Sequence, residues 1–361
     1  MVRDTVRIVE FGDIWKMAID IPYSLMVGRG AQAWTCGQLA MSVDGKVTAG
    51  NDFDTQARIV RDYGLEILRR AGLSAGNMRR IVNYYIPGET DREAMLTELF
   101  REAFGDDVLI DFVPLPHFYY DGILLECDFF CGPEIVRKES RQTATGSVEV
   151  HLTASDAWVS VTVSSNDVAA TGAWILDVLN EAGLGRENVL TEHWTAPSHA
   201  LSAVMGECAG IGEGFDPLAI VNAGPSDKLV RARFRLLRGT TVSGEVMETD
   251  GLTLLVRTAK DEAWMQARSN DPARGLVGGT RAAMEVFSLK MAELGYSFAD
   301  VGKQTTHYVG GSSDELHDNM QVRNSYYSKP GPASTGVPVR GLADRSAATV
   351  IDLTLVRNWR K

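Results

Sequence analysis

The chain of 361 residues has few of the features that tie a protein to a membrane or to nucleic acid. No apolar run approaches 18 residues, so the sequence predicts no transmembrane helix. The charged, alternating start of the chain lacks the apolar segment of a signal peptide. The formal net charge of −11 argues against a surface that follows phosphates. We therefore expect a cytoplasmic protein with neither a membrane nor a nucleic acid as its partner.

Cysteine is also scarce, and the chain lacks the motifs of common metal and nucleotide sites. Four cysteines are too few and too irregularly spaced for a disulfide framework. Cys127 and Cys131 are four residues apart, which is not the spacing of a zinc knuckle. The six histidines form no HExxH pattern, and neither a Walker sequence nor GxGxxG is present. The sequence thus predicts reduced cysteines, no metal and no cofactor.

What the chain does contain is a pattern that occurs three times. An Ala-Trp pair precedes a strand-like stretch at three places, with the tryptophans Trp34, Trp158 and Trp264. A helix-like stretch follows each pair and stops at a glycine, which is Gly72, Gly183 or Gly295. These glycines are 111 and 112 residues apart. The near-constant period indicates three tandem units, and each glycine is a candidate for the end of a helix.

Each unit reads as a mixture of helices and strands. Apolar periodicity predicts helices over 54–71, 170–182 and 278–294, and β-branched stretches predict strands over 78–86, 188–196 and 301–309. A further helix and further strands follow in every unit, which predicts an α+β fold. Clusters of charged and small residues place the boundaries at 1–135, 136–242 and 243–361.

The first unit resembles the Rid (YjgF) family. The resemblance rests on Pro22-Tyr23, on Gly37-Gln38 at the end of a strand, on the turn Asp44–Lys46, on the element 55–58 and on the helix end 71–73. The third unit fits over 278–287, 305–309 and 324–335, whereas the second fits only by pattern. The combination of these elements is specific, although no single one is.

The resemblance implies chorismate-mutase-like α+β units that assemble as trimers, with sheets inside, helices outside and active sites between subunits. Three units in one chain then imply a pseudo-trimer around a pseudo-threefold axis, monomeric or forming a small homo-oligomer. A homotrimer has three identical clefts, whereas a fused chain can keep one working site and let the others change.

Rid enzymes hydrolyse enamines and imines without a cofactor, and they use an Arg to clamp the substrate carboxylate and a Glu to position water. The resemblance places the Glu at Glu126, and it places Asp352 and Arg231 in the same register of the other units. The position of the Arg carries Ser334 in the third unit, Ile110 in the first, and Ala219 or Ile220 in the second. A serine or isoleucine cannot replace the bidentate guanidinium, so the usual 2-imino acid substrate is in question.

The charged candidates each have two interpretations. Strand alternation puts Glu126 and Asp128 on one face, where paired carboxylates raise one pKa for acid–base chemistry, or where one faces solvent and the other pairs with an arginine. Arg231 and Arg233 either clamp an anion from a new direction or join a buried ion network. Arg340 is either a further clamp or part of an exposed turn.

The uncharged candidates gather in the first unit. Tyr23 is either a cleft residue or an ordinary strand tyrosine, and Gly37 allows a substrate to approach the backbone. Cys36 is a nucleophile, a cleft-lining residue or an inert buried thiol. His117 precedes the strand of Glu126 and is a candidate for a contact at the rim of the cleft. His307 is a weaker candidate, for which a core histidine is the alternative.

These patterns lead to three functional hypotheses. The first is a hydrolase or deaminase that acts on a small polar imine, enamine or related C–N compound at a cleft between units. The second is a ring-opening enzyme of the cyanuric acid hydrolase and barbiturase type, although no Ser-Gly-Gly element or lysine repeats in register. The third is a non-catalytic protein that binds a metabolite. Every version has a small molecule as its partner.

Overall fold

The computed structural model describes residues 5–212, 217–222, 224 and 227–360. Sheet 1 and its two helices come first in the chain. They comprise β1 (Val6–Val9), β2 (Met26–Arg29), β3 (Gln32–Thr35), β4 (Gln38–Leu39), α1 (Phe53–Arg70), β5 (Met78–Tyr85), α2 (Arg92–Phe104), β6 (Leu109–Pro114) and β7 (Leu125–Cys131).

Sheets 2 and 3 follow, again with two helices each. Sheet 2 and its helices comprise β8 (Ile135–Gln142), β9 (Gly146–Thr153), β10 (Asp156–Ser164), α3 (Thr171–Glu181), β11 (Val189–Ala196), α4 (Leu201–Glu207), β12 (Ile220–Asn222) and β13 (Leu229–Leu237). Sheet 3 and its helices comprise β14 (Ser243–Thr249), β15 (Leu252–Thr258), β16 (Glu262–Ser269), α5 (Gly275–Glu293), β17 (Val301–Val309), α6 (Ser313–Asn324), β18 (Ala333–Val339) and β19 (Thr349–Val356). The prediction of an α+β fold is confirmed.

The three sheets have the same strand order. They run β1-β2-β3-β7-β5-β6, β8-β9-β10-β13-β11-β12 and β14-β15-β16-β19-β17-β18, and β4 pairs with β7 beside the first path. In each sheet the last two strands of this order are parallel and the other neighbours are antiparallel. A helix connects each parallel pair, since parallel strands need a long crossover.

The helix ends also agree between the three parts of the chain. Gly72, Gly183 and Gly295 have φ of 65°, 76° and 73° and follow α1, α3 and α5. The next amide N–H in each case donates to a carbonyl of the last helical turn, at 2.9, 2.9 and 2.7 Å. Only glycine adopts this left-handed conformation without strain. The three glycines are therefore the helix ends that the sequence predicts.

The strand registers match as well. Trp34 faces Phe130, Trp158 faces Arg235 and Trp264 faces Thr354, each on the third strand of its sheet. Likewise, Val82 faces Asp128, His193 faces Arg233 and Thr305 faces Asp352, in each case shortly after a bulge in β5, β11 or β17. Asp128, Arg233 and Asp352 thus occupy corresponding positions. The arrangement around a pseudo-threefold axis stays a prediction.

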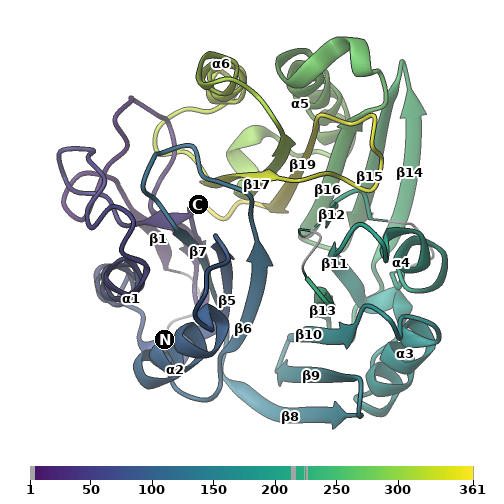
Figure 1. Ribbon diagram of the computed structural model, residues 1–361. Helices are drawn as coiled ribbons and strands as arrows, with labels where there is room; N and C mark the ends of the chain where they lie inside the picture. The colour runs from purple at the N-terminus through teal and green to yellow at the C-terminus, as the bar shows by residue number, and fades with distance from the viewer. Residues whose placement is uncertain (1–4, 213–216, 223, 225–226, 361) are drawn as a thin grey trace.

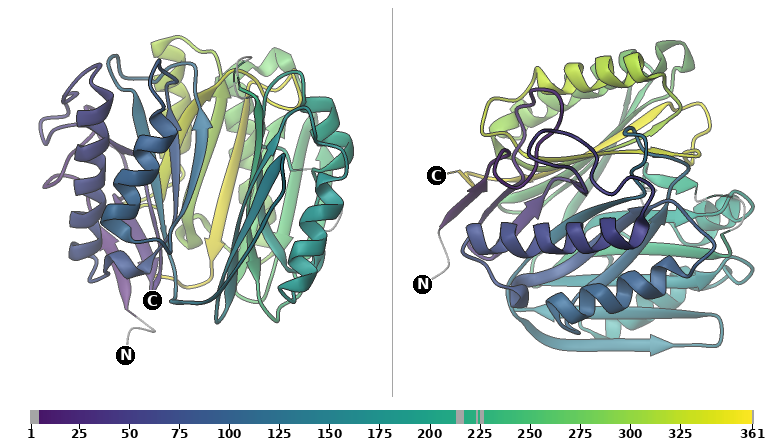
Figure 2. Two further views of the ribbon diagram at one scale, coloured as in Figure 1. Left: turned by 60° about the horizontal axis from the view of Figure 1, so that its bottom comes forward. Right: turned by 60° about the vertical axis from the view of Figure 1, so that its left-hand side comes forward.

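The helices lie on the outside of the molecule and the sheets face inward (Figures 1 and 2). Each sheet packs against its own helices around an apolar core, and a fourth apolar cluster joins side chains of all three sheets. No helix in the described part of the chain is long and apolar enough to cross a membrane. The spaces between sheets are where a ligand site can form.

Candidate active site

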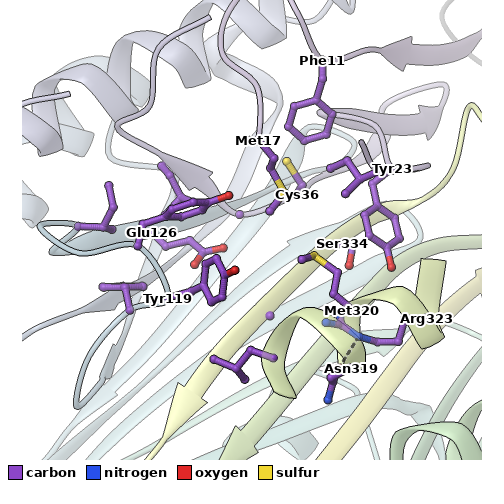
Figure 3. A pocket seen from close by; sticks show the side chains of 18 of the residues that line it. Phe11, Met17, Tyr23, Cys36, Tyr119, Glu126, Asn319, Met320, Arg323 and Ser334 are labelled. Atoms are coloured by element: carbon purple, nitrogen blue, oxygen red, sulfur yellow. Dashed lines mark hydrogen bonds between the residues drawn. The ribbon is translucent and has the colours of Figure 1, made fainter. Parts of the chain in front are cut away.

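A cavity lies between sheet 1 and sheet 3, and its space, with the open solvent at its mouth included, is about 850 Å³. Side chains from residues 11–23, from Cys36 to Leu39 and from 118–126 line one side, and side chains of β17, α6 and β18 line the other. Figure 3 shows Glu126 entering from the first side and Arg323 from α6 on the opposite side. The structure thus brings Tyr23, Cys36, Gly37 and Glu126 together, as the sequence predicts, and adds Ser334.

Glu126 is a buried carboxyl that faces this cavity. Its side chain is 6% exposed and has no hydrogen-bond partner among the described residues. Burial raises its pKa to about 8, and the neighbouring Asp128 carboxylate adds to the rise, while Lys303 opposes it. A carboxyl with this pKa exists in both protonation states near neutral pH, which suits a general acid or base. Gly37 makes room for it, because a Cβ there would lie 1.6 Å from Oε1 of Glu126.

Asp128 is held by a buried ion pair rather than by solvent. Nζ of Lys303, on β17 of sheet 3, lies 2.7 Å from Oδ1 of Asp128. The same ammonium donates to the carbonyl of Thr35 at 2.8 Å and to Oγ1 of Thr335 at 2.6 Å, so its three donors are satisfied. Both charges are almost fully buried. The pair therefore joins sheets 1 and 3 behind Glu126, and the sequence did not predict that a lysine would neutralise Asp128.

Arg323 is the cation of the cavity, and the sequence patterns did not predict it. The residue is 6% exposed, its Nε donates to Oδ1 of Asn319 at 3.0 Å, and its Nη1 donates to Oγ1 of Thr306 at 3.0 Å. No carboxylate among the described residues pairs with it. A signal was present in the sequence, because Asn319 and Arg323 are four residues apart and so share one face of the helix. Both are buried, and α6 therefore turns polar side chains inward.

Aromatic and sulfur-containing side chains form most of the remaining wall. They are Phe11, Trp15, Met17, Tyr23, Phe118, Tyr119, Tyr120, Tyr308 and Met320. The hydroxyl of Tyr23 lies near Gln304 and Ser334 without meeting hydrogen-bond geometry with them, and burial raises its pKa. Its phenol therefore stays protonated and can donate a hydrogen bond. The cavity combines an apolar wall with a few polar groups, as small-molecule sites do.

Cys36 lines the cavity but lacks the environment of a nucleophile. Burial raises the pKa of its thiol, and the Asp128 and Glu126 carboxylates add to the rise against the opposing effect of Lys303. The side-chain amide of Gln38 donates to the sulfur at 3.1 Å, and Trp15 holds the oxygen of that amide at 2.8 Å. Since a nucleophilic cysteine needs a lowered pKa, the structure favours the cleft-lining role.

The register proposed for Asp352 is wrong by two residues. Strand pairing places Asp352 at the position of Asp128, and Val350 is the residue that corresponds to Glu126. A shift of two residues keeps the same strand face, so alternation in the sequence cannot detect it. Asp352 lies away from the Glu126 cavity, 3.4 Å from Nε2 of His193. Val350 belongs to the apolar cluster that contains Leu218 and Leu342.

Arg231 does correspond to Glu126, but it is part of an ion network. Its guanidinium lies 2.6 Å from Asp227 and 2.8 Å from Glu93, which lies on α2 of the neighbouring part of the chain. Tyr85 donates to the same Glu93 at 2.5 Å. The structural alternative is therefore the one observed. The position that holds Glu126 in one cleft holds a neutralised arginine in the second and a valine in the third.

The remaining candidates lie outside the cavity. His117 is exposed and does not line it, although Phe118, Tyr119 and Tyr120 do. Arg340 is also exposed and lines a separate hollow beside Tyr85 and Asp227. The predicted roles of His117 and Arg340 in the Glu126 cavity are therefore wrong. The loop that contains His117 turns its aromatic side chains into the cavity instead of the histidine, and Arg340 lines the other hollow.

Two further features concern histidine and metal ions. Burial lowers the pKa of His307 to about 3, so the ring is neutral, as expected of a core histidine. Within the described ranges, no group of three or more His, Cys, Asp or Glu side chains is placed to hold a metal ion.

The polar groups of the Glu126 cavity, namely one carboxyl, one guanidinium and several hydroxyls, match proton transfer to a bound organic anion.

No protein-family model and no curated protein matches the chain. Among solved structures, a chorismatase is similar at 12% identity over 78% of this chain and 93% of its own, with a TM-score of 0.49. A putative endoribonuclease from Thermotoga maritima has 22% identity over 36% of this chain and 98% of its own, with a TM-score of 0.31. YyfA of the conserved Rid protein family from Yersinia pestis has 17% identity, a TM-score of 0.30, and coverages of 36% and 99%. The Rid-family structures thus each span about a third of this chain.

Proposed function

We propose that the cavity between sheets 1 and 3 binds a small organic anion and that Glu126 transfers protons in the hydrolysis of an imine, an enamine or a related C–N bond. The observation that carries the proposal is the pairing, in one cavity, of a buried carboxyl whose pKa is about 8 with a buried guanidinium that no described carboxylate neutralises. Arg323 would take over from α6 the role that a strand arginine has in the Rid pattern.

The proposed chemistry follows from the state of Glu126. Hydrolysis of an imine adds one water molecule across the C=N bond and then expels ammonia, which leaves a C=O bond. The protonated carboxyl donates its proton to the nitrogen, and the resulting carboxylate accepts a proton from the attacking water. The proton then passes to the departing nitrogen, and the carboxylate takes the hydroxyl proton as ammonia leaves, which forms the C=O bond and restores the protonated carboxyl. The pKa of about 8 keeps both forms accessible without a metal or a cofactor.

The division of the chain belongs to the same proposal. We infer tandem units at 1–135, 136–242 and 243–361, with one cleft kept for chemistry and two that lack the catalytic carboxyl. In one of these clefts the matching position holds Arg231, which two carboxylates neutralise, and in the other it holds Val350 with its apolar neighbours. A single chain would then be sufficient for activity, whether or not it forms a small homo-oligomer.

A panel of substrates tests the proposed function. The purified chain is given 2-imino acids generated in situ, neutral imines and enamines, and cyclic amides, and the release of ammonia or ring opening is followed. Ammonia release from an anionic imine or enamine supports the proposal. Turnover of cyclic amides alone would favour the ring-opening alternative, and binding without turnover of any compound would favour a metabolite-binding protein.

Arg323→Met is expected to weaken the binding of an anionic substrate more than it slows turnover. Methionine fills similar space but removes the charge and the paired N–H donors of the guanidinium. A hydrogen bond to a charged group contributes roughly 1.5–3 kcal/mol. KM should therefore rise by about one to two orders of magnitude, with a smaller change in kcat. Arg323→Lys keeps the charge but not the fork, and should recover part of the loss. An unchanged KM in Arg323→Met would remove Arg323 from the proposed site.

Gly37→Ala is expected to disable the site without unfolding the chain. The new Cβ would lie 1.6 Å from Oε1 of Glu126, and the atom that must move is the end of a flexible side chain rather than backbone. Turnover should fall by about tenfold or more because the carboxyl is displaced from its position. Gly50→Ala is the matched control, since its Cβ would meet nothing closer than 3.8 Å. Equal activity in both variants would contradict the assigned position of Glu126.

A further inference from the structure

A second cavity, which we call the central cavity, is lined by side chains of all three sheets. Its space, with the open solvent at its mouth included, is about 520 Å³, and it shares no lining residue with the cavity of Glu126. Trp34, Phe130 and Trp158 provide aromatic walls, and Thr191, Thr305 and Thr354 contribute hydroxyls. Figure 1 shows the three sheets facing the middle of the molecule. The proposed hydrolytic function makes no use of it.

The wall of the central cavity carries an excess of positive charge. The cations on it are Arg80, Arg233, Arg235 and Lys303, and Asp352 is the one carboxylate among the lining residues. The carboxylates that neutralise three of these cations stand behind the wall, with ion-pair distances of 2.7 Å for Arg80–Asp111, 2.6 Å for Arg235–Asp156 and 2.7 Å for Lys303–Asp128. The groups that face the cavity itself are therefore mainly cationic.

Arg233 differs from the other three cations. Its side chain is 9% exposed and makes no hydrogen bond or ion pair with any described residue. Asp352 makes no ion pair with it, and that carboxylate instead lies 3.4 Å from Nε2 of His193 and accepts from Trp264 at 3.4 Å. Burial and the field of Arg233 lower the pKa of His193, so this ring adds no charge at neutral pH. A guanidinium that lines a cavity without a protein partner has its donors available to a ligand that enters the cavity.

We propose that the central cavity is a binding site for a small oxyanion, with the guanidinium of Arg233 as its principal ligand. Two parallel N–H groups of an arginine match two oxygens of a phosphate, a sulfate or a carboxylate. The threonine hydroxyls supply further hydrogen-bond donors, and the surrounding cations supply a positive electrostatic potential that favours an anion. The strand register explains why the site exists here, since Arg233 stands where the other two sheets have Asp128 and Asp352.

Titration calorimetry of the full chain with inorganic phosphate, in a buffer free of other oxyanions, tests the proposal. We expect wild type and Arg323→Met to bind phosphate with the same Kd, and Arg233→Met to bind it at least about tenfold more weakly. Arg233→Lys should bind with intermediate affinity. Equal binding by wild type and Arg233→Met, absence of binding by wild type, or loss in Arg323→Met alone would overturn the proposal. The last of these results would place the anion in the other cavity.

A crystal of the wild-type chain soaked in selenate gives a second measurement that does not depend on how well a variant folds. The anomalous signal of selenium is expected within hydrogen-bond distance of the Arg233 guanidinium. A central cavity without such a signal would contradict the site. Neither measurement uses turnover, so the failure of this proposal and the failure of the proposed hydrolytic function are distinguishable.

Discussion

Replacing Glu126 with glutamine is expected to lower turnover by about two to four orders of magnitude and, at the same time, to stabilise the fold above neutral pH. Glutamine keeps the shape of the side chain but can neither donate nor accept the catalytic proton. Its amide also never acquires the charge that burial opposes. Activity and stability should therefore change in opposite directions, which is typical of a residue retained for function.

The pH dependence follows from the shift of the pKa of Glu126 from 4.5 to about 8. Below pH 4.5 the carboxyl is protonated in both the folded and the unfolded chain. Between these values the unfolded chain has lost the proton that the folded chain still holds, so stability falls by roughly 1.4 kcal/mol for each pH unit. Above pH 8 both states are ionised and the loss is complete. Glu126→Gln should lack this loss.

Urea unfolding at pH 5 and at pH 8.5, together with turnover at neutral pH, measures both parts of the prediction. Wild type and Glu126→Gln should differ little in stability at pH 5, and the variant should be the more stable at pH 8.5. Glu134→Gln is the matched control, because Glu134 is exposed and follows β7 closely. A variant that keeps its activity, or a stability difference that does not depend on pH, would show that Glu126 is not the buried acid of the site.

Most of the fold is visible in the sequence because local rules determine its elements. The strand predicted over 301–309 and the helix stops at Gly72, Gly183 and Gly295 are confirmed, since they depend on β-branched runs and on the left-handed conformation of glycine. Glu126 and Gly37 are likewise placed together in one cavity, as their positions in the Rid pattern predict. These features need no information about partners distant in the chain.

The residues that the sequence could not place depend on contacts between distant segments. Lys303 lies 175 positions from Asp128 in the sequence, and no periodicity in either strand predicts that they pair. Asp352 has the same side-chain direction as Val350, so only hydrogen-bonded pairing distinguishes their registers. Arg323 enters the cavity from a helix, whereas the resemblance directs attention to a strand. The chemistry of the cavity is therefore decided by how the sheets meet.

Lys303→Met is expected to cost about 3–5 kcal/mol of unfolding free energy. The variant leaves the Asp128 carboxylate fully buried without its cation, and it removes hydrogen bonds to Thr35 and Thr335. It should also raise the pKa of Glu126 further, because Lys303 is the cation that lowers it. The stability loss is measured by urea unfolding at pH 7, and the pKa change by the alkaline limb of the pH–rate profile.

Two further variants separate the buried charge from the loss of a long side chain. Lys290→Met is the matched control, since Lys290 is also buried but pairs with Glu245 and Glu293, which are 51% and 63% exposed. Its loss should cost about 1 kcal/mol or less, because water can solvate the carboxylates left behind. Adding Asp128→Asn to Lys303→Met should recover part of the lost stability, since an amide is less costly to bury than an unpaired carboxylate. Equal losses in the two lysine variants, or no recovery in the double variant, would mean that the ion pair does not hold sheets 1 and 3 together behind Glu126.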